Sequence, residues 1–128
     1  MKFLLDTHAF IWLNSSPEKL SARVRGHCEQ GTDRFYLSLV SPWEMQIKRQ
    51  LGKLSYDPIN DQLVRANLDR NNINLLPISL VHVEQLAQLP MHHRDPFDRM
   101  LVAQAQIEGM TLITADTALA PYDVAILW

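Results

Sequence analysis

Short apolar runs alternate with helical patterns along this chain, and this alternation constrains the fold more than any other feature of the sequence. Each run is only a few residues long and almost continuously apolar, which is typical of parallel strands covered on both faces. The runs lie at residues 2–5, 35–40, 73–78, 111–114 and 124–128. Together with the intervening helices they predict an α/β three-layer sandwich with a central, mainly parallel five-stranded sheet.

Helix start and stop signals separate the apolar runs. Ser16–Pro17 and Ser41–Pro42 each pair an N-cap residue with a proline suited to the first helical position. Helices are therefore predicted at residues 17–30, 42–51, 58–70, 79–90 and 95–108, and a short one is predicted to begin at Thr7. Because no repeat or linker interrupts this pattern, residues 1–128 are predicted to form a single domain.

The charge and the cysteine content of the chain exclude several classes of protein. The formal net charge of −2 provides no overall basic field, so an RNA-binding chain of this kind would need local cations or metal ions to offset phosphate charge. The single cysteine, Cys28, excludes an internal disulfide and a cysteine-based zinc site. No window approaches the length of a membrane span, and Asp6 interrupts the apolar start of the chain. We therefore expect a cytoplasmic protein without membrane association.

Four acidic residues occupy corresponding places in the predicted topology. Asp6 directly follows the first apolar run, and Glu44 lies in the first turn of the helix after the second run. Asp98 lies in the first turn of the helix at 95–108, and Asp116 follows the run at 111–114. Sites in parallel sheets form beyond the carboxyl ends of strands, so these carboxylates are expected to converge. Such a cluster suits hard ions such as Mg²⁺ or Mn²⁺, which can activate water for phosphodiester hydrolysis.

Each of these acids also has a purely structural explanation. Asp6 can cap the helix beginning at Thr7, and Glu44 has the favoured spacing for an ion pair with Lys48. Asp98 can interact with a helix dipole, and Asp116 can serve an ordinary turn. Only the shared topological position of the four acids therefore favours a site over these structural roles.

Four short motifs occur in order along the chain: LLDTHA at 4–9, SPWE at 41–44, HRDPFDR at 93–99 and LITAD at 112–116. Their order and spacing resemble PIN-domain proteins, and VapC-like toxins of bacterial toxin–antitoxin pairs in particular. The resemblance spans nearly the whole chain. It implies a PIN fold, RNA cleavage dependent on Mg²⁺ or Mn²⁺, homodimers, and inhibition by a cognate antitoxin protein.

By motif position, the resemblance makes four acids the catalytic and metal-binding residues: Asp6, Glu44, Asp98 and Asp116. We take Asp6 and Asp98 as the principal ligands, with the other two binding directly or through water. Thr114 inherits the role of a hydroxyl near the site. Asp95 either orients the metal-binding residues without binding the ion itself or caps the helix that it precedes, and capping is favoured by Pro96.

Basic residues flank the proposed acids and have two equally weighted interpretations, namely contacts to RNA phosphate or ordinary surface charges. They are Lys48, Arg49, Arg94 and Arg99. His92 and His93 lie in the same segment as Arg94. We expect both to be solvated loop residues, with phosphate contact as the alternative.

Two other enzyme or module classes fit the sequence less well. A phosphatase with a nucleophilic aspartate is expected to carry a second aspartate two residues after Asp6, where this chain has His8. A receiver-like module needs a late lysine, and the last lysine here is Lys53. A PIN-like module that binds or processes RNA without a toxin role remains an alternative.

Overall fold

A computed structural model describes residues 1–55 and 60–128. Its strands form one sheet in the order β3–β2–β1–β4–β5, and every neighbouring pair is parallel. The strands are β1 (Lys2–Leu5), β2 (Arg34–Ser38), β3 (Ile73–Leu76), β4 (Thr111–Ile113) and β5 (Ile126–Leu127). The predicted five-stranded sheet is therefore confirmed, and it is parallel throughout.

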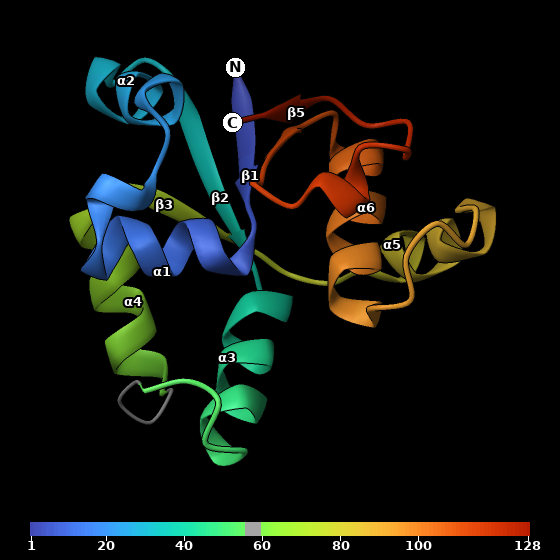
Figure 1. Ribbon diagram of the computed structural model, residues 1–128, viewed down its shortest axis with the longest axis horizontal. Coiled ribbons are helices and arrows are strands. Elements are labelled where there is room, and N and C mark those ends of the chain that lie inside the picture. Colours follow the sequence, from blue (N-terminus) through green and yellow to red (C-terminus); the bar gives the residue numbers. More distant parts are fainter. Residues whose placement is uncertain (56–59) are drawn as a thin grey trace.

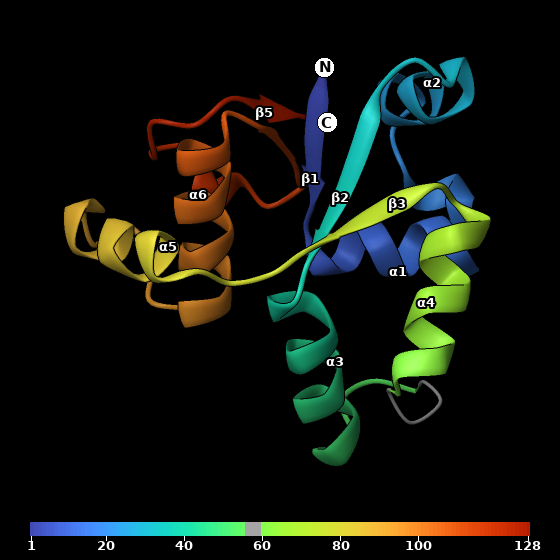
Figure 2. The ribbon, with the colours of Figure 1, turned by 180° about the vertical axis from the view of Figure 1, so that it is seen from behind.

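Helices cover both faces of this sheet, with α1, α2 and α4 on one side and α5 and α6 on the other (Figures 1 and 2). The α-helices are α1 (Thr7–Ser15), α2 (Ala22–Gln30), α3 (Val40–Gln50), α4 (Asp61–Arg70), α5 (Leu80–Gln85) and α6 (Pro96–Glu108). Short 3₁₀ turns occupy Pro17–Lys19, Leu86–Gln88 and Thr117–Leu119. Within the described ranges, no helix is long and apolar enough to cross a membrane.

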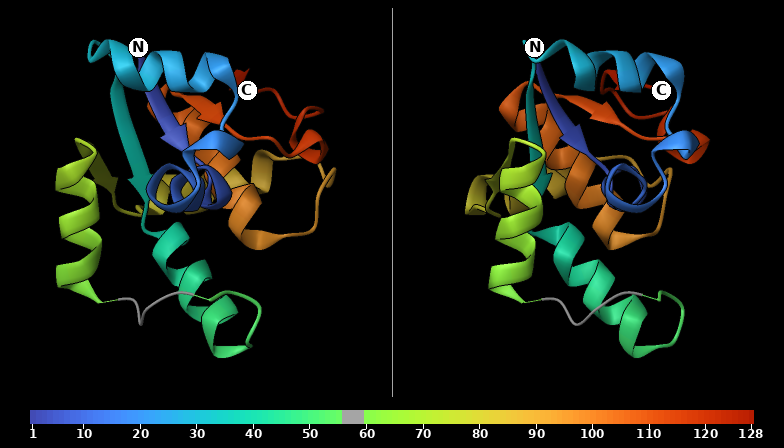
Figure 3. Two further views of the ribbon diagram at one scale, coloured as in Figure 1. Left: turned by 60° about the vertical axis from the view of Figure 1, so that its left-hand side comes forward. Right: turned by 90° about the vertical axis from the view of Figure 1, so that its left-hand side faces the viewer.

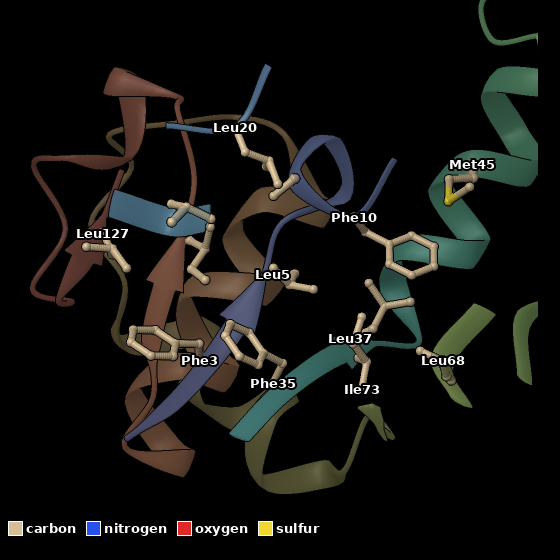
Figure 4. Close-up of a cluster of buried hydrophobic side chains, with 13 residues drawn as sticks. Phe3, Leu5, Phe10, Leu20, Phe35, Leu37, Met45, Leu68, Ile73 and Leu127 are labelled. Atoms are coloured by element: carbon tan, nitrogen blue, oxygen red, sulfur yellow. The ribbon is translucent and has the colours of Figure 1, made fainter. Parts of the chain in front are cut away.

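The apolar core is divided into two clusters by the sheet. Phe3 and Leu5 of β1 belong to the cluster that also contains Phe10 of α1 (Figure 4). Leu4 points to the opposite face, where it joins the cluster that contains Leu101 of α6. Alternate side chains of a strand point to opposite faces, so burial on both sides requires the continuous apolar runs seen in the sequence.

The prediction of one helix over residues 17–30 is wrong. The segment instead contains the 3₁₀ turn Pro17–Lys19, an extended Leu20 with ψ 144°, and then α2. The Ser21 hydroxyl restarts the helix because it accepts a hydrogen bond from the backbone N–H of Val24 at 3.2 Å.

Other element boundaries also shift. The apolar run 35–40 does not end as a strand at Val40, because Val40 begins α3. The Ser38 hydroxyl accepts a hydrogen bond from the Val40 N–H at 3.1 Å, which turns the chain at that point. The helix predicted over 79–90 ends as an α-helix at Gln85 and continues as a 3₁₀ turn. The start predicted at residue 58 lies outside the described residues.

The strand order places a natural site at the centre of the sheet. From β1 the chain proceeds to β2 on one side, and it later returns to β4 on the other side of β1. This reversal lies at the carboxyl ends of β1 and β4, which is where ligands bind in open α/β sheets. Figure 3 shows β1 leading into α1 and β2 leading into α3 at this same end.

Candidate metal centre

Asp6 links the central strand to α1. Its Oδ1 accepts a hydrogen bond from the backbone N–H of Ala9 at 2.7 Å. Asp6 therefore caps α1, which is the structural role that the sequence allowed for it. The side chain is buried, and this burial raises its pKa, while a hydrogen bond from the Thr114 hydroxyl acts in the opposite direction. A buried carboxylate at the carboxyl end of β1 can serve as both a helix cap and an oxygen ligand.

Glu44 projects from α3 and has partners on both carboxylate oxygens. Its Oε1 accepts a hydrogen bond from the Thr7 hydroxyl at 2.7 Å, and its Oε2 lies 2.7 Å from Nζ of Lys48. Only 6% of the Glu44 side chain is exposed. The ion pair considered from the sequence is therefore present, but at a buried carboxylate rather than on a solvated helix face.

Asp98 and Asp116 converge from α6 and from the turn after β4. Together with His93 they offer one ligand atom each, and these three atoms lie within 4.8 Å of one another. Nε2 of His93 is 2.9 Å from Oδ2 of Asp98 and 3.8 Å from Oδ2 of Asp116. Among the described residues this compact group does not include Asp6 or Glu44, so the four predicted acids do not form one equally tight cluster.

Electrostatic coupling nevertheless joins the acids into one centre. Burial is the largest cause that raises the pKa of Asp98 to about 6, and the charges of Asp95 and Glu44 contribute to the same rise. The charge of Glu44 also contributes to the raised pKa of Asp6. Negative charge is therefore concentrated where carboxylate oxygens are available, and a bound divalent cation would relieve the repulsion. The donor set fits a hard ion such as Mg²⁺ or Mn²⁺.

Thr114 and Asp95 both hydrogen-bond to backbone groups of the proposed ligands. The Thr114 hydroxyl oxygen accepts a hydrogen bond from the Asp116 N–H at 3.0 Å, in addition to its contact with Asp6. Oδ1 of Asp95 accepts hydrogen bonds from the backbone N–H groups of Phe97 and Asp98, which makes Asp95 the N-cap of α6. Capping, the favoured interpretation from the sequence, is confirmed for Asp95.

The expectation that His93 is a solvated loop residue is wrong. In addition to its contact with Asp98, its backbone N–H donates a hydrogen bond to the hydroxyl of Tyr122 at 2.9 Å. Tyr122 is buried and lies 29 residues away in the sequence. The only sequence signal for this placement was the position of His93 five residues before Asp98, which by itself does not predict a contact.

The four basic residues have different environments. Arg49 is partly buried in the last turn of α3. Lys48 pairs with Glu44, whereas Arg94 is exposed beside the cluster. Arg99 points into the protein: its guanidinium donates hydrogen bonds to the Pro90 carbonyl at 2.8 Å and to the Tyr122 hydroxyl at 3.1 Å. It also donates to the carbonyls of Leu86 and Leu89. Arg99 therefore holds the loop before α6, a role that differs from both interpretations of its charge, phosphate contact and ordinary surface charge.

The large indole of Trp43, next to Glu44, lies outside the acidic cluster. It is 58% exposed and packs edge-on against Phe97, with ring centroids 5.0 Å apart. Phe97 precedes Asp98, so this aromatic pair connects the first turns of α3 and α6. The contact holds together the two helices that supply Glu44 and Asp98.

Comparison with known proteins identifies both a family model and related structures. The model described as PIN domain matches residues 3–125. No curated protein sequence matches the chain. The chain is similar to one in the crystal structure of VapBC2 from Rickettsia felis bound to a promoter DNA fragment, with a TM-score of 0.71, 14% identity, and coverage of 99% of this chain and 98% of that one.

Two further structures are similar to this chain over nearly its whole length. The DNA-bound VapBC of Salmonella typhimurium has a TM-score of 0.71 and 17% identity, and the alignment covers 99% of this chain and 97% of that one. A toxin–antitoxin complex from Klebsiella pneumoniae has a TM-score of 0.66 and 20% identity, with coverage of 98% and 95%. At these identities the likeness establishes a shared fold.

Proposed function

The chain belongs to the PIN-domain family, and from this premise we propose that it is a metal-dependent endoribonuclease acting as the toxin of a bacterial toxin–antitoxin pair. The observation that supports this function most directly is the convergence of Asp98 and Asp116 at the carboxyl end of the sheet. Asp6 is linked to the same place through Thr114. This arrangement supplies the carboxylate oxygens that phosphodiester hydrolysis with a hard cation requires.

The proposed ion is Mg²⁺ or Mn²⁺, held chiefly by Asp6 and Asp98 with Asp116 and Glu44 completing the charge cluster. When bound, such an ion supplies an activated water and stabilises negative charge on the phosphate. Thr114 orients the carboxylate of Asp6 through its hydroxyl. Lys48 pairs with Oε2 of Glu44, which offsets part of the charge of this buried carboxylate.

Basic side chains near the centre are proposed to contact the RNA backbone. Arg94 is exposed directly beside His93 and Asp95, and Lys48 and Arg49 lie on the helix that carries Glu44. Such contacts position the phosphates without reading base sequence. Arg99 is not part of this proposal, because its guanidinium holds the loop before α6.

A cognate antitoxin is the proposed protein partner, and a homodimer in the cytoplasm is the proposed working form. The antitoxin partner is supported by the similarity to the chain of VapBC2 from Rickettsia felis and to that of a toxin–antitoxin complex from Klebsiella pneumoniae. The family and the intact acidic cluster favour a nuclease over a PIN-like module that only binds RNA.

RNA cleavage tests the proposed activity. Purified antitoxin-free protein incubated with a mixed tRNA and rRNA pool is expected to cut RNA with Mn²⁺ and to stop cutting in EDTA. Asp6→Asn is expected to lower the cleavage rate about 100-fold, since one group of a preorganised charge cluster is removed. Asparagine is itself a good N-cap residue, so the variant should stay folded.

Asp61→Asn provides the matched control, because Asp61 lies in the first turn of α4 with 77% of its side chain exposed. Its cleavage rate should equal that of the wild type. Equal cleavage by wild type and Asp6→Asn, or cleavage that persists in EDTA, would contradict the proposed function.

A further inference from the structure

The imidazole of His93 lies between two carboxylates of the proposed metal centre. Its Nε2 is 2.9 Å from Oδ2 of Asp98 and 3.8 Å from Oδ2 of Asp116. A nitrogen in this position can act either as a metal ligand or as a hydrogen-bond donor. The two roles require different tautomers, because a ligand needs a lone pair on Nε2 and a donor needs a proton there.

The partners of the ring specify one tautomer. On the far side of the ring, Nδ1 lies 3.0 Å from the backbone nitrogen of Arg94, whose N–H points at it. A backbone N–H can only donate, so Nδ1 must hold the lone pair and the ring proton must be on Nε2. On the near side, an ionised carboxylate of Asp98 can only accept, which requires a proton on the same Nε2. Both partners therefore select the Nε2–H form.

The loop that holds this ring is fixed from within the protein. The backbone N–H of His93 donates to the hydroxyl of buried Tyr122 at 2.9 Å. Arg99, in turn, donates from Nη1 to the same hydroxyl at 3.1 Å.

A metal-ligating histidine normally donates its other ring N–H to an acceptor. Here that nitrogen faces an N–H group, so exchanging the tautomer would place two donors against each other.

We infer that His93 is a positioning residue that donates its Nε2–H to Asp98 and stays out of the coordination of the bound ion. The inference rests on the proposed metal-dependent function. Its chemical consequence is a centre whose protein ligands are oxygens only. Such a set favours Mg²⁺ or Mn²⁺, whereas an added imidazole nitrogen would favour softer ions such as Zn²⁺ or Ni²⁺.

The tautomer can be measured directly on the wild-type protein. ¹⁵N NMR of histidine-labelled protein separates protonated from unprotonated ring nitrogens, and the His93→Gln variant assigns the His93 signals among the five histidines of the chain. The Nε2 of His93 is expected to keep its proton both without metal and with saturating diamagnetic Mg²⁺. Loss of the Nε2 proton and appearance of an Nδ1 proton when Mg²⁺ is added would overturn the inference.

Metal affinity provides a second, independent readout. His93→Ala is expected to weaken Mn²⁺ binding about tenfold, because the partner that orients Asp98 is lost. His93→Gln should recover most of this affinity, because its amide N–H can replace the donor. Equal losses in both variants, or wild-type affinity in His93→Ala, would overturn the inference.

His92→Ala is the matched control for these titrations. His92 precedes His93 in the same loop, but its ring packs edge-on against Tyr122, with centroids 5.0 Å apart. The Mn²⁺ affinity of His92→Ala is expected to equal that of the wild type. A tenfold loss of Mn²⁺ affinity in His92→Ala would mean that any change in this loop weakens binding, and it would overturn a specific role for His93.

Failure of this inference is distinguishable from failure of the proposed function, because neither readout uses RNA. A protein that binds Mg²⁺ with His93 still protonated at Nε2, yet cuts no RNA, would contradict the nuclease and support the positioning role. A protein that cuts RNA while His93 coordinates the ion would contradict only the positioning role.

Discussion

Asp98→Asn is expected to lower RNA cleavage about 1,000-fold while making the metal-free protein more stable. Asp98 lies beside Asp116 and His93, so its carboxylate is central to the proposed metal centre. The same position disfavours its charge, because burial and then the charges of Asp95 and Glu44 raise its pKa from 3.8 to about 6. A neutral amide removes this unfavourable charge and one oxygen ligand at the same time.

The size of the stability gain follows from the pKa shift. Each unit corresponds to about 1.4 kcal/mol, and solvent screening at this partly exposed side chain reduces the full value to about 1–2 kcal/mol. We expect the Tm in EDTA at about pH 7.5 to rise by about 5 °C. Because the folded-state pKa is raised, the wild type bears this penalty above about pH 6 and loses it as the pH falls toward the unfolded pKa.

Thermal unfolding in EDTA at about pH 7.5 and about pH 4.5 therefore checks the sign of the effect. The Asp98→Asn gain should be largest at the higher pH and small at the lower one. Asp61→Asn, at an exposed site paired with Arg65, should show no such gain. A lower Tm for Asp98→Asn at the higher pH, or unchanged RNA cleavage, would contradict the account of this residue.

Arg99→Ala is expected to destabilise the protein by about 2–3 kcal/mol and to reduce cleavage as well. Its guanidinium donates to the Pro90 carbonyl and to the Tyr122 hydroxyl, and Tyr122 accepts the backbone N–H of His93. Truncation removes several charge-assisted hydrogen bonds and frees the loop that positions His93. The Tm is expected to fall by about 10 °C.

Two variants make this test specific. Arg99→Lys should recover less than half of the lost stability, because an ammonium cannot reproduce the planar fork of donors. Arg65→Ala removes an arginine whose side chain is 62% exposed and pairs with Asp61 across one helical turn, so its Tm should change by less than about 2 °C. If Arg99→Ala is as stable as Arg65→Ala, Arg99 does not hold the loop as described.

The sequence predicted the parts of the molecule that depend on local patterns. Burial on both faces of a parallel sheet requires continuous apolar runs, so residues 2–5 could be recognised as a strand. Pro96 after Asp95 signalled the start of α6, which begins as predicted. Asp98 could be placed near the site because the first turn of that helix lies at the carboxyl end of the sheet.

Features that depend on distant contacts were not predictable in this way. His93 is held by Tyr122, and nothing in either local segment indicates that they meet. Arg99 carries a charge that favours solvent or phosphate, yet its donors satisfy the carbonyls of Leu86 and Pro90, in a segment that the sequence predicted to be helical to its end. The interruption of the predicted helix at Leu20 was not predicted, because the helical spacing of apolar residues in 17–30 continues through it.

Calorimetric titration with Mn²⁺ measures whether this acidic centre binds a divalent ion through its carboxylates. The wild type and Asp61→Asn are expected to bind Mn²⁺ with equal affinity. Asp98→Asn and Asp116→Asn are expected to bind at least about tenfold more weakly, because each lacks one of the clustered ligand oxygens. Wild-type affinity in both of these variants, or no Mn²⁺ binding by the folded wild type, would contradict the binding of a divalent ion by these carboxylates.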